Sequence, residues 1–116
     1  RSQFGQPIGE FQLLQGMIAD SKAESYAAEC MIFDTAKRRD NGENVNTLAS
    51  CCKLFATETV GRVADRAVQY HGGAGYIEEY AVARFYRDVR LFRIYEGTSQ
   101  IQQGIIARNL MRAAKT

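Results

Sequence analysis

The sequence contains one proline, one histidine and no tryptophan, and these shortages argue against several kinds of protein. With a single histidine and no clustered cysteines, a metal site built by this chain alone is not expected. The three cysteines are odd in number and lack the spacing of metal ligands, which indicates free thiols in a reducing compartment: Cys30, Cys51 and Cys52. No apolar run approaches the roughly 18 residues of a membrane span, and no secretory signal peptide is recognisable.

Length and composition set the scale of the fold. A chain of 116 residues predicts one domain, residues 1–116, with enough apolar material for one core. Hydrophobic residues make up 46% of the chain and charged residues 24%, so we expect an ordered globular protein. The net charge of +2 does not require a nucleic acid or an anionic membrane as a partner. The first residue is Arg1 and not methionine, which suggests a fragment or a processed product.

Long stretches without proline or glycine predict helices. Apolar residues recur at helical spacing over residues 10–39, and Gly42 is suited to end this first helix in a left-handed conformation. Steps of three and four residues separate the apolar side chains that we expect to face the core. They are Phe11, Leu14, Ile18, Ala19, Ala23, Tyr26, Cys30 and Phe33.

A second long helix is expected to begin at Asn46 or Thr47 and to end at His71. Residues 72–75 contain three glycines, each of which destabilises a helix by about 1 kcal/mol relative to alanine, so they predict a turn. The inner face of the second helix should comprise Leu48, Cys52, Phe55, Thr59, Val63, Ala67 and Tyr70.

Two shorter helices complete the predicted fold. One spans residues 79–91, and residues 92–97 connect it to the next. Thr98 or Ser99 is the expected N-cap of the last helix, which runs through Ala113 with Ile101, Ile105 and Leu110 facing inward. No alternating apolar pattern is long enough to predict a strand. The sequence therefore predicts an all-α, up-down helical bundle.

Two residues are candidates for chemistry by their type and position. His71 can act in catalysis, but the more ordinary interpretation is a turn residue that caps a helix C-terminus. Glu96 lies between Tyr95 and Gly97, just before a predicted helix, where burial and the helix dipole can tune a carboxylate. By the residues alone, a structural capping role near the helix start is the more ordinary interpretation of Glu96.

Four arginines follow one another at steps of three: Arg84, Arg87, Arg90 and Arg93. They could form a basic stripe for nucleic acid. A step of three drifts around a helix, however, and Glu79 and Asp88 are close by in sequence. We therefore favour salt bridges and subunit contacts for these arginines over nucleic-acid binding.

Taken together, these features resemble the C-terminal helical domain of the flavin-dependent acyl-CoA dehydrogenase family. The similarity extends over nearly the whole chain, and the second and fourth of its four segments are the most specific. The segments are residues 1–12, residues 67–76, residues 79–90 and residues 94–102. The resemblance implies the family's up-down bundle, without the helix that normally precedes Arg1.

The resemblance also implies a role for the segment around Glu96. Glu96 matches the base that removes the α-proton of an acyl-CoA thioester, while the β-hydrogen passes as hydride to the flavin. The backbone N–H of Glu96 and a flavin ribityl hydroxyl would stabilise the enolate oxygen. Tyr95 is expected to shape the acyl pocket, and Gly97 to leave room for the substrate.

FAD is the cofactor that the resemblance implies. Arg1 matches the arginine that reaches the flavin pyrophosphate, to which a guanidinium is well suited. Phe4 and Gln12 belong to the same flavin-contacting region. Two further expected flavin contacts lie just after the base, at Thr98 and Gln100. A segment that touches the dinucleotide of a neighbouring subunit supplies the remaining ones, Gln69, Gly72 and Gly73.

These expectations concern a complete enzyme, whose N-terminal helical domain and middle β-domain are not part of this chain. We expect the 116 residues alone to be inactive and to associate through exposed apolar surface, as a dimer or a larger homo-oligomer. The implied partners are an acyl-CoA and an electron-transferring flavoprotein, in the bacterial cytoplasm or the mitochondrial matrix. An acyl-CoA oxidase-like relative and a non-catalytic helical assembly module are the alternatives.

Overall fold

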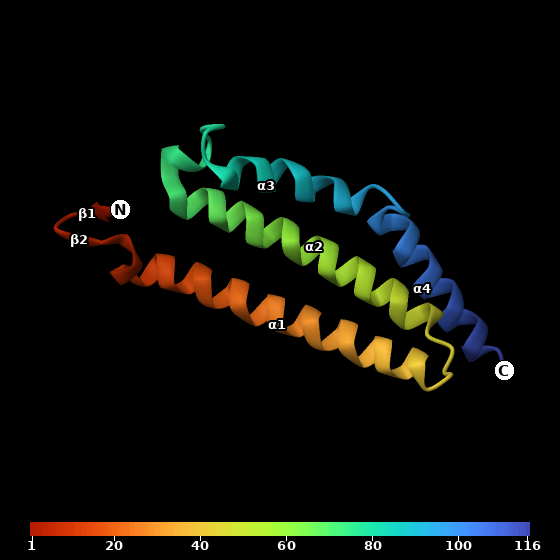
Figure 1. The fold of residues 1–116 in the computed structure, drawn as a ribbon. Coiled ribbons are helices and arrows are strands. Elements are labelled where there is room, and N and C mark those ends of the chain that lie inside the picture. The colour runs from red at the N-terminus through yellow and green to blue at the C-terminus, as the bar shows by residue number, and fades with distance from the viewer.

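Two long antiparallel helices, α1 (Gln12–Asp40) and α2 (Asn46–His71), form the centre of the computed structural model, which describes residues 1–116 (Figure 1). The shorter helices α3 (Ala81–Arg90) and α4 (Ser99–Ala114) follow one another along α2, on the side away from α1. The molecule is elongated, with principal extents of 63 × 25 × 24 Å. The predicted all-α, up-down bundle with two long and two shorter helices is confirmed.

The ends of the helices follow from local sequence. Gly42 has a φ of 84°, and the N–H groups of Gly42 and Glu43 donate to the carbonyls of Arg39 and Arg38 at 2.9 and 3.1 Å. This pair of bonds is the Schellman motif that a glycine after a helix makes possible. At the start of α4, the Thr98 hydroxyl accepts a hydrogen bond from the Ile101 N–H at 3.1 Å, which confirms Thr98 as the N-cap.

The N-terminal residues form a hairpin that the sequence pattern does not predict. Strand β1 (Ser2–Gln3) pairs with the antiparallel strand β2 (Gln6–Pro7), and a 3₁₀ turn at Ile8–Glu10 leads into α1. The turn residues Phe4 and Gly5 both have positive φ, 52° and 82°. Strands of two residues are too short to produce an alternating apolar pattern, so periodicity cannot reveal them.

The predicted inner face of α1 is wrong for most of its residues. Ile18, Tyr26 and Phe33 are 49%, 61% and 67% exposed. Apolar side chains surround more than one face of α1, and periodicity does not tell which face meets α2. Ala19, Ala23 and Cys30 are exposed as well, whereas the half-buried side chains of the helix are Leu14, Met17, Ser21, Glu24, Ala27, Ala28, Met31 and Thr35.

The inner face predicted for α2 is confirmed except for Leu48, which is 37% exposed. In α4 the prediction fails for Ile101 and Leu110, which are 56% and 60% exposed, while Ile105 is half-buried as expected. The two buried residues of α4 are polar: Ser99 and Gln102 are 4% and 8% exposed.

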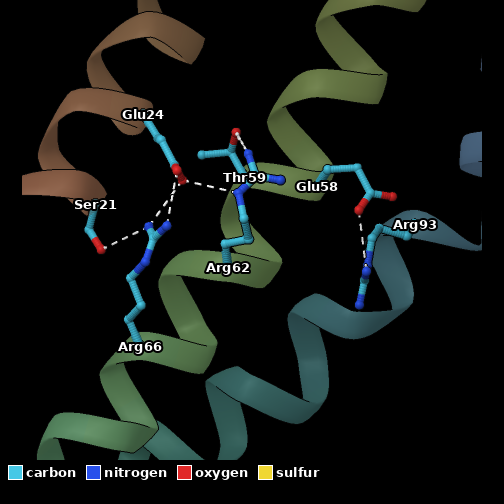
Figure 2. Close-up of polar contacts among 7 residues, drawn as sticks. All are labelled: Ser21, Glu24, Glu58, Thr59, Arg62, Arg66 and Arg93. Atoms are coloured by element: carbon cyan, nitrogen blue, oxygen red, sulfur yellow. Dashed lines mark hydrogen bonds and ion pairs between the residues drawn. The ribbon is translucent and has the colours of Figure 1, made fainter. Parts of the chain in front are cut away.

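Little of the molecule is fully buried. Only 6 of 116 residues are buried, and the one hydrophobic side chain among them is Ala64. Polar contacts also join the two long helices. Glu24 on α1 accepts hydrogen bonds from Arg62 and Arg66 on α2, at 3.2 and 3.0 Å (Figure 2).

The cysteines lie within α1 and α2, and all three are free thiols, as the sequence indicates. The sulfur of Cys52 contacts the hydroxyl of Thr35 at 3.1 Å and thereby adds to the α1–α2 interface. None of the helices combines the length and the apolar character that crossing a membrane requires.

Candidate active site

Glu96 lies in the turn between a 3₁₀ segment at Leu91–Arg93 and the start of α4. Its φ is 53°, and the φ of Gly97 is 89°. A left-handed backbone at a residue other than glycine costs of order 1–3 kcal/mol, and such residues cluster at functional sites. The Glu96 side chain is exposed, and its carboxylate forms no hydrogen bond or ion pair within the chain. The carboxylate is therefore free to act on another molecule.

The residue after Glu96 has to be a glycine for two reasons. Its φ of 89° disfavours any side chain, and a Cβ at Gly97 would lie 2.7 Å from Nε2 of Gln102. That amide nitrogen donates to the Glu96 carbonyl at 3.3 Å. Gln102 is thus packed directly against the turn and holds its backbone.

Lys53 on α2 holds the same turn from the other side. Its Nζ donates to the carbonyls of Phe92, Tyr95 and Gly97 at 2.7, 3.1 and 2.6 Å. An ammonium group has three hydrogens, so the connection before α4 uses its full donor capacity. The Glu96 turn is therefore fixed by a residue 43 positions earlier in the chain.

Glu58, also on α2, anchors both flanks of the turn. Its Oε1 accepts from the Ser99 hydroxyl at 2.6 Å, and its Oε2 accepts from Nη1 of Arg93 at 3.3 Å. Figure 2 shows the contact with Arg93. The Ser99 hydrogen bond, followed by that from Arg93, lowers the pKa of Glu58 below its ordinary value, although burial opposes the shift. The carboxylate is therefore the form of Glu58 that holds the start of α4.

Other residues that the sequence assigns to this end of the site lie in or beside the turn. Tyr95 is 46% exposed, and its ring stacks on Phe92 with centroids 5.7 Å apart. Thr98 uses its hydroxyl oxygen to cap α4, and Gln100 is exposed on the first turn of that helix. The structure thus brings Tyr95, Glu96, Gly97, Thr98 and Gln100 together.

A second group of predicted residues gathers where α2 ends. Arg1 donates from Nη1 to the His71 carbonyl at 3.3 Å. Gly72 has a φ of 63°, which disfavours a side chain, and a Cβ there would lie 3.0 Å from the Arg1 Nη1. Arg1 and Gly73 line an open groove, which is completed by Ile8, Tyr70, His71, Ala74, Ile77 and Tyr80.

Packing within the chain also explains a glycine in the turn at residues 72–75. Gly75 is buried, and a Cβ there would lie 2.5 Å from the Val68 carbonyl oxygen. The turn therefore packs against the last turns of α2. His71 is the last residue of α2, and its ring Nδ1 lies 2.6 Å from the Ala67 carbonyl, which agrees with the capping interpretation.

Three further predicted residues lie near this end of the molecule but outside the lining of the groove. Phe4 is 93% exposed and meets the ring of Phe11 edge-on, with centroids 6.2 Å apart. Gln12 is the exposed first residue of α1, and Gln69 is exposed near the end of α2.

The two groups do not form one pocket within this chain. The groove lies beside the turn that precedes α3, and the Glu96 turn follows α3, so the ten residues of this helix separate them (Figure 1). At a rise of 1.5 Å per residue, such a helix is about 15 Å long.

The arginine row does not form a continuous stripe. Arg84, Arg87 and Arg90 are exposed and form no salt bridge, so the partners expected from sequence, Glu79 and Asp88, are wrong. Arg93 instead pairs with Glu58 on α2 at 3.3 Å. No group of three or more histidine, cysteine, aspartate or glutamate side chains lies close enough to hold a metal ion.

Sequence reasoning missed the residues that hold the Glu96 turn, namely Lys53, Glu58 and Gln102. Each lies within a helix and reaches its partner through the tertiary fold, so no local pattern reveals its task. The one available signal is that charged side chains occur among the half-buried positions of α2.

The bundle and the turn together define a class of protein: an all-α domain with one carboxylate in left-handed backbone, directly before a helix N-terminus. Residues 1–111 match the family described as the C-terminal domain of acyl-CoA dehydrogenases. The chain belongs to the acyl-CoA dehydrogenase family, as its sequence suggested.

Individual relatives agree with this assignment. The chain is 46% identical over 112 residues to the caffeyl-CoA reductase–Etf complex subunit CarC of Acetobacterium woodii, covering 97% of this chain and 30% of that protein. It is 41% identical over 114 residues to the cyclohexane-1-carbonyl-CoA dehydrogenase of Geobacter metallireducens, covering 98% and 30%. The structure of butyryl-CoA dehydrogenase from Megasphaera elsdenii matches with a TM-score of 0.93 and 37% identity, over 96% of this chain and 29% of that one.

Proposed function

We propose that this chain is the C-terminal helical part of a flavin-dependent enzyme that dehydrogenates acyl-CoA thioesters to trans-2-enoyl-CoA, with Glu96 as the base. The observation that carries the proposal is the Glu96 turn, in which an unpaired carboxylate is held in strained backbone. The chain spans 28–30% of the length of its relatives, so the remainder of the substrate site lies in other parts of such an enzyme.

The proposed step begins with proton removal. The Glu96 carboxylate takes the α-proton of the thioester, and the charge that develops is shared with the thioester oxygen. A carboxylate in water is a weak base for such a proton. Desolvation by the bound acyl chain would make the carboxylate a stronger base toward this proton.

The oxygen on which charge develops needs hydrogen-bond donors that are already in place. The backbone N–H of Glu96 forms no hydrogen bond within the chain, so it can serve as such a donor. The next residue, Gly97, has no side chain. The base and the donor would thus come from the same residue.

The second group of residues fits the anionic part of a flavin dinucleotide. Arg1 uses one guanidinium nitrogen on the His71 carbonyl, and its other N–H groups remain free for a pyrophosphate. Gly72 has no side chain to fill the space beside that guanidinium. The flavin, when bound, would supply the hydride acceptor for the β-hydrogen.

Because the two groups lie at opposite ends of α3, we infer that they serve different flavins in an oligomer, and that the chain assembles with copies of itself. We also propose an electron-transferring flavoprotein as a partner. A relative with 46% identity that is named as a subunit of an Etf complex supports this second proposal.

The direction of the reaction is a further part of the proposal. Relatives include proteins named as dehydrogenases and others named as reductases of acyl-CoA compounds. By microscopic reversibility the same carboxylate and the same N–H donor serve both directions. We propose dehydrogenation, and an oxidase-like variant would differ by rapid reaction of the reduced holoenzyme with oxygen.

Replacing the proposed base tests the function. In the full-length enzyme that carries this segment, we expect Glu96→Gln to lower turnover of an acyl-CoA by about 100-fold or more, the range of general-base catalysis. The control is Asp20→Asn, a carboxylate exposed on α1 without a hydrogen bond, which should leave turnover unchanged. Unchanged turnover in Glu96→Gln would instead favour a helical assembly module.

A further inference from the structure

Lys53 is the one cation on α2 that contacts the turn of the proposed base, with two of its three hydrogen bonds in the turn and the third on Phe92 in the 3₁₀ segment before it. Its three hydrogen bonds reach carbonyls at both sides of Glu96, over distances of 2.6–3.1 Å. One of these carbonyls, that of Tyr95, belongs to the same peptide unit as the Glu96 N–H. A contact with this unit acts directly on the donor that the proposed mechanism uses.

The geometry of a trans peptide makes the contact directional. The carbonyl and the N–H of one peptide unit point in opposite directions, because the unit is planar. The hydrogen bond of 3.1 Å from the Lys53 ammonium to the Tyr95 carbonyl therefore fixes the direction of the Glu96 N–H. A positive charge on the carbonyl also polarises the unit and strengthens the N–H as a donor.

The strain in the turn requires such a contact. Glu96 has a φ of 53°, which unsupported backbone avoids. Gln102 holds the carbonyl of Glu96 itself, at 3.3 Å, and Lys53 holds the carbonyls before and after it. Lys53 provides the larger part of this support because it is charged and binds three groups.

We propose that Lys53 is a positioning residue for the reaction: it aims the Glu96 N–H at the thioester oxygen and keeps the Glu96 carboxylate over the α-carbon. The proposal rests on the function proposed above for Glu96. It assigns Lys53 no contact with the substrate. Its effect should therefore appear in the reaction step and in the polarisation of the bound thioester, with little effect on substrate affinity.

The test uses Lys53→Met in the full-length holoenzyme, with all rates expressed per bound flavin. We expect kcat to fall by about 10- to 100-fold, somewhat less than the loss of a direct oxyanion donor, while KM changes little. The infrared stretching frequency of the thioester carbonyl in bound trans-2-enoyl-CoA should rise toward its value in water, because a hydrogen bond to a carbonyl lowers that frequency.

A matched control separates positioning from stability. Arg66 is also a cation on α2, but it binds Glu24 on α1, away from the turn. Arg66→Met should lower the unfolding temperature and leave both kcat per flavin and the carbonyl frequency unchanged. If Lys53→Met behaves like Arg66→Met in these two measurements, the positioning role is wrong.

Two further variants settle the remaining outcomes. If Lys53→Met does not fold, Lys53→Arg decides, because a planar guanidinium keeps the charge but cannot reproduce the three-way contact. A lower kcat with a raised carbonyl frequency supports the proposal, and wild-type values of both contradict it. Glu96→Gln separates a failure of the proposed function from a failure of the proposed role of Lys53. Full activity of Glu96→Gln would overturn the proposed function. An inactive Glu96→Gln together with a fully active Lys53→Met would overturn only the role of Lys53.

Discussion

At the scale of single residues, the turn before α4 combines one unfavourable conformation with several contacts that enforce it. Glu96 and Gly97 have consecutive positive φ values of 53° and 89°, and only the second belongs to a glycine. Strain of this kind persists only where surrounding contacts determine the backbone. Lys53 and Gln102 provide those contacts, and Glu58 fixes the start of the helix that follows.

Gly97→Ala should show how closely the turn is packed. We expect it to lower the free energy of unfolding by about 1–3 kcal/mol, because a Cβ would be strained at this φ and would lie 2.7 Å from Gln102 Nε2. Gly104→Ala is the control on α4, where a Cβ meets nothing within 4 Å, and it should stabilise the helix by up to about 1 kcal/mol. Urea unfolding measures both, and equal effects of the two variants would contradict this interpretation.

The site itself could be predicted only in part from sequence. Glu96 and Gly97 are adjacent residues in a recognisable segment, so sequence can single them out, although the left-handed conformation of Glu96 is visible only in the structure. Lys53 acts on this segment across 43 positions of the chain, through a contact that depends on how α2 lies beside the turn. A residue whose task depends on such a contact carries no local signal.

At the scale of helices, boundaries follow local chemistry, whereas the choice of buried face does not. Gly42 and Thr98 end and begin helices at the predicted places because turn and cap residues act on their own backbone. Ile18, Tyr26 and Phe33 were expected to face inward and are exposed. Helix α1 has apolar residues on more than one side, and only the position of α2 selects which of them are covered.

Glu24 makes the pairing of α1 with α2 depend on pH. Its hydrogen bond with Arg66, followed by that with Arg62, lowers the pKa of Glu24 below its ordinary value of 4.5. Because the pKa of Glu24 is lowered in the folded state, its contacts with the arginines stabilise the protein fully at pH values above the ordinary pKa. This stabilisation is lost as the pH falls through the lower, folded-state value.

We therefore expect Arg66→Met to destabilise the protein at pH 7 and to do so much less at a pH below the lowered folded-state pKa of Glu24, where this carboxylate is protonated in both proteins. The measurement is the urea midpoint at each pH. Lys22→Met, which changes an exposed cation of α1 without a salt bridge, should show no such dependence. A destabilisation by Arg66→Met that stays constant between the two pH values would argue against the role of Glu24.

At the scale of the whole molecule, the bundle is thin and leaves much apolar surface uncovered. Only 6 of 116 residues are buried, and no side chain is fully enclosed. A groove between α1 and α2 is lined largely by apolar residues, among them Ala28, Ile32, Phe33, Val60 and Val63. Apolar surface of this kind usually marks an interface with another chain or domain.

We expect the 116-residue chain to associate in solution through this groove. Light scattering should give a mass of at least two chains at high concentration, and Phe33→Ser should weaken the association by removing a ring that is 67% exposed in the groove. Tyr76→Ser is the matched control, since its ring is 86% exposed in the turn before α3, outside the groove. A clean monomer at high concentration would contradict the expectation.

The central claim is that Glu96 removes the α-proton of an acyl-CoA, and hydrogen exchange at that carbon tests it most directly. The full-length holoenzyme is incubated in deuterium oxide with an acyl-CoA whose β-carbon cannot transfer hydride, and deuterium at the α-carbon is followed by mass spectrometry. Glu96→Gln should slow this exchange by about 100-fold or more, while Asp20→Asn exchanges at the wild-type rate. Exchange at the wild-type rate in Glu96→Gln would show that another group is the base.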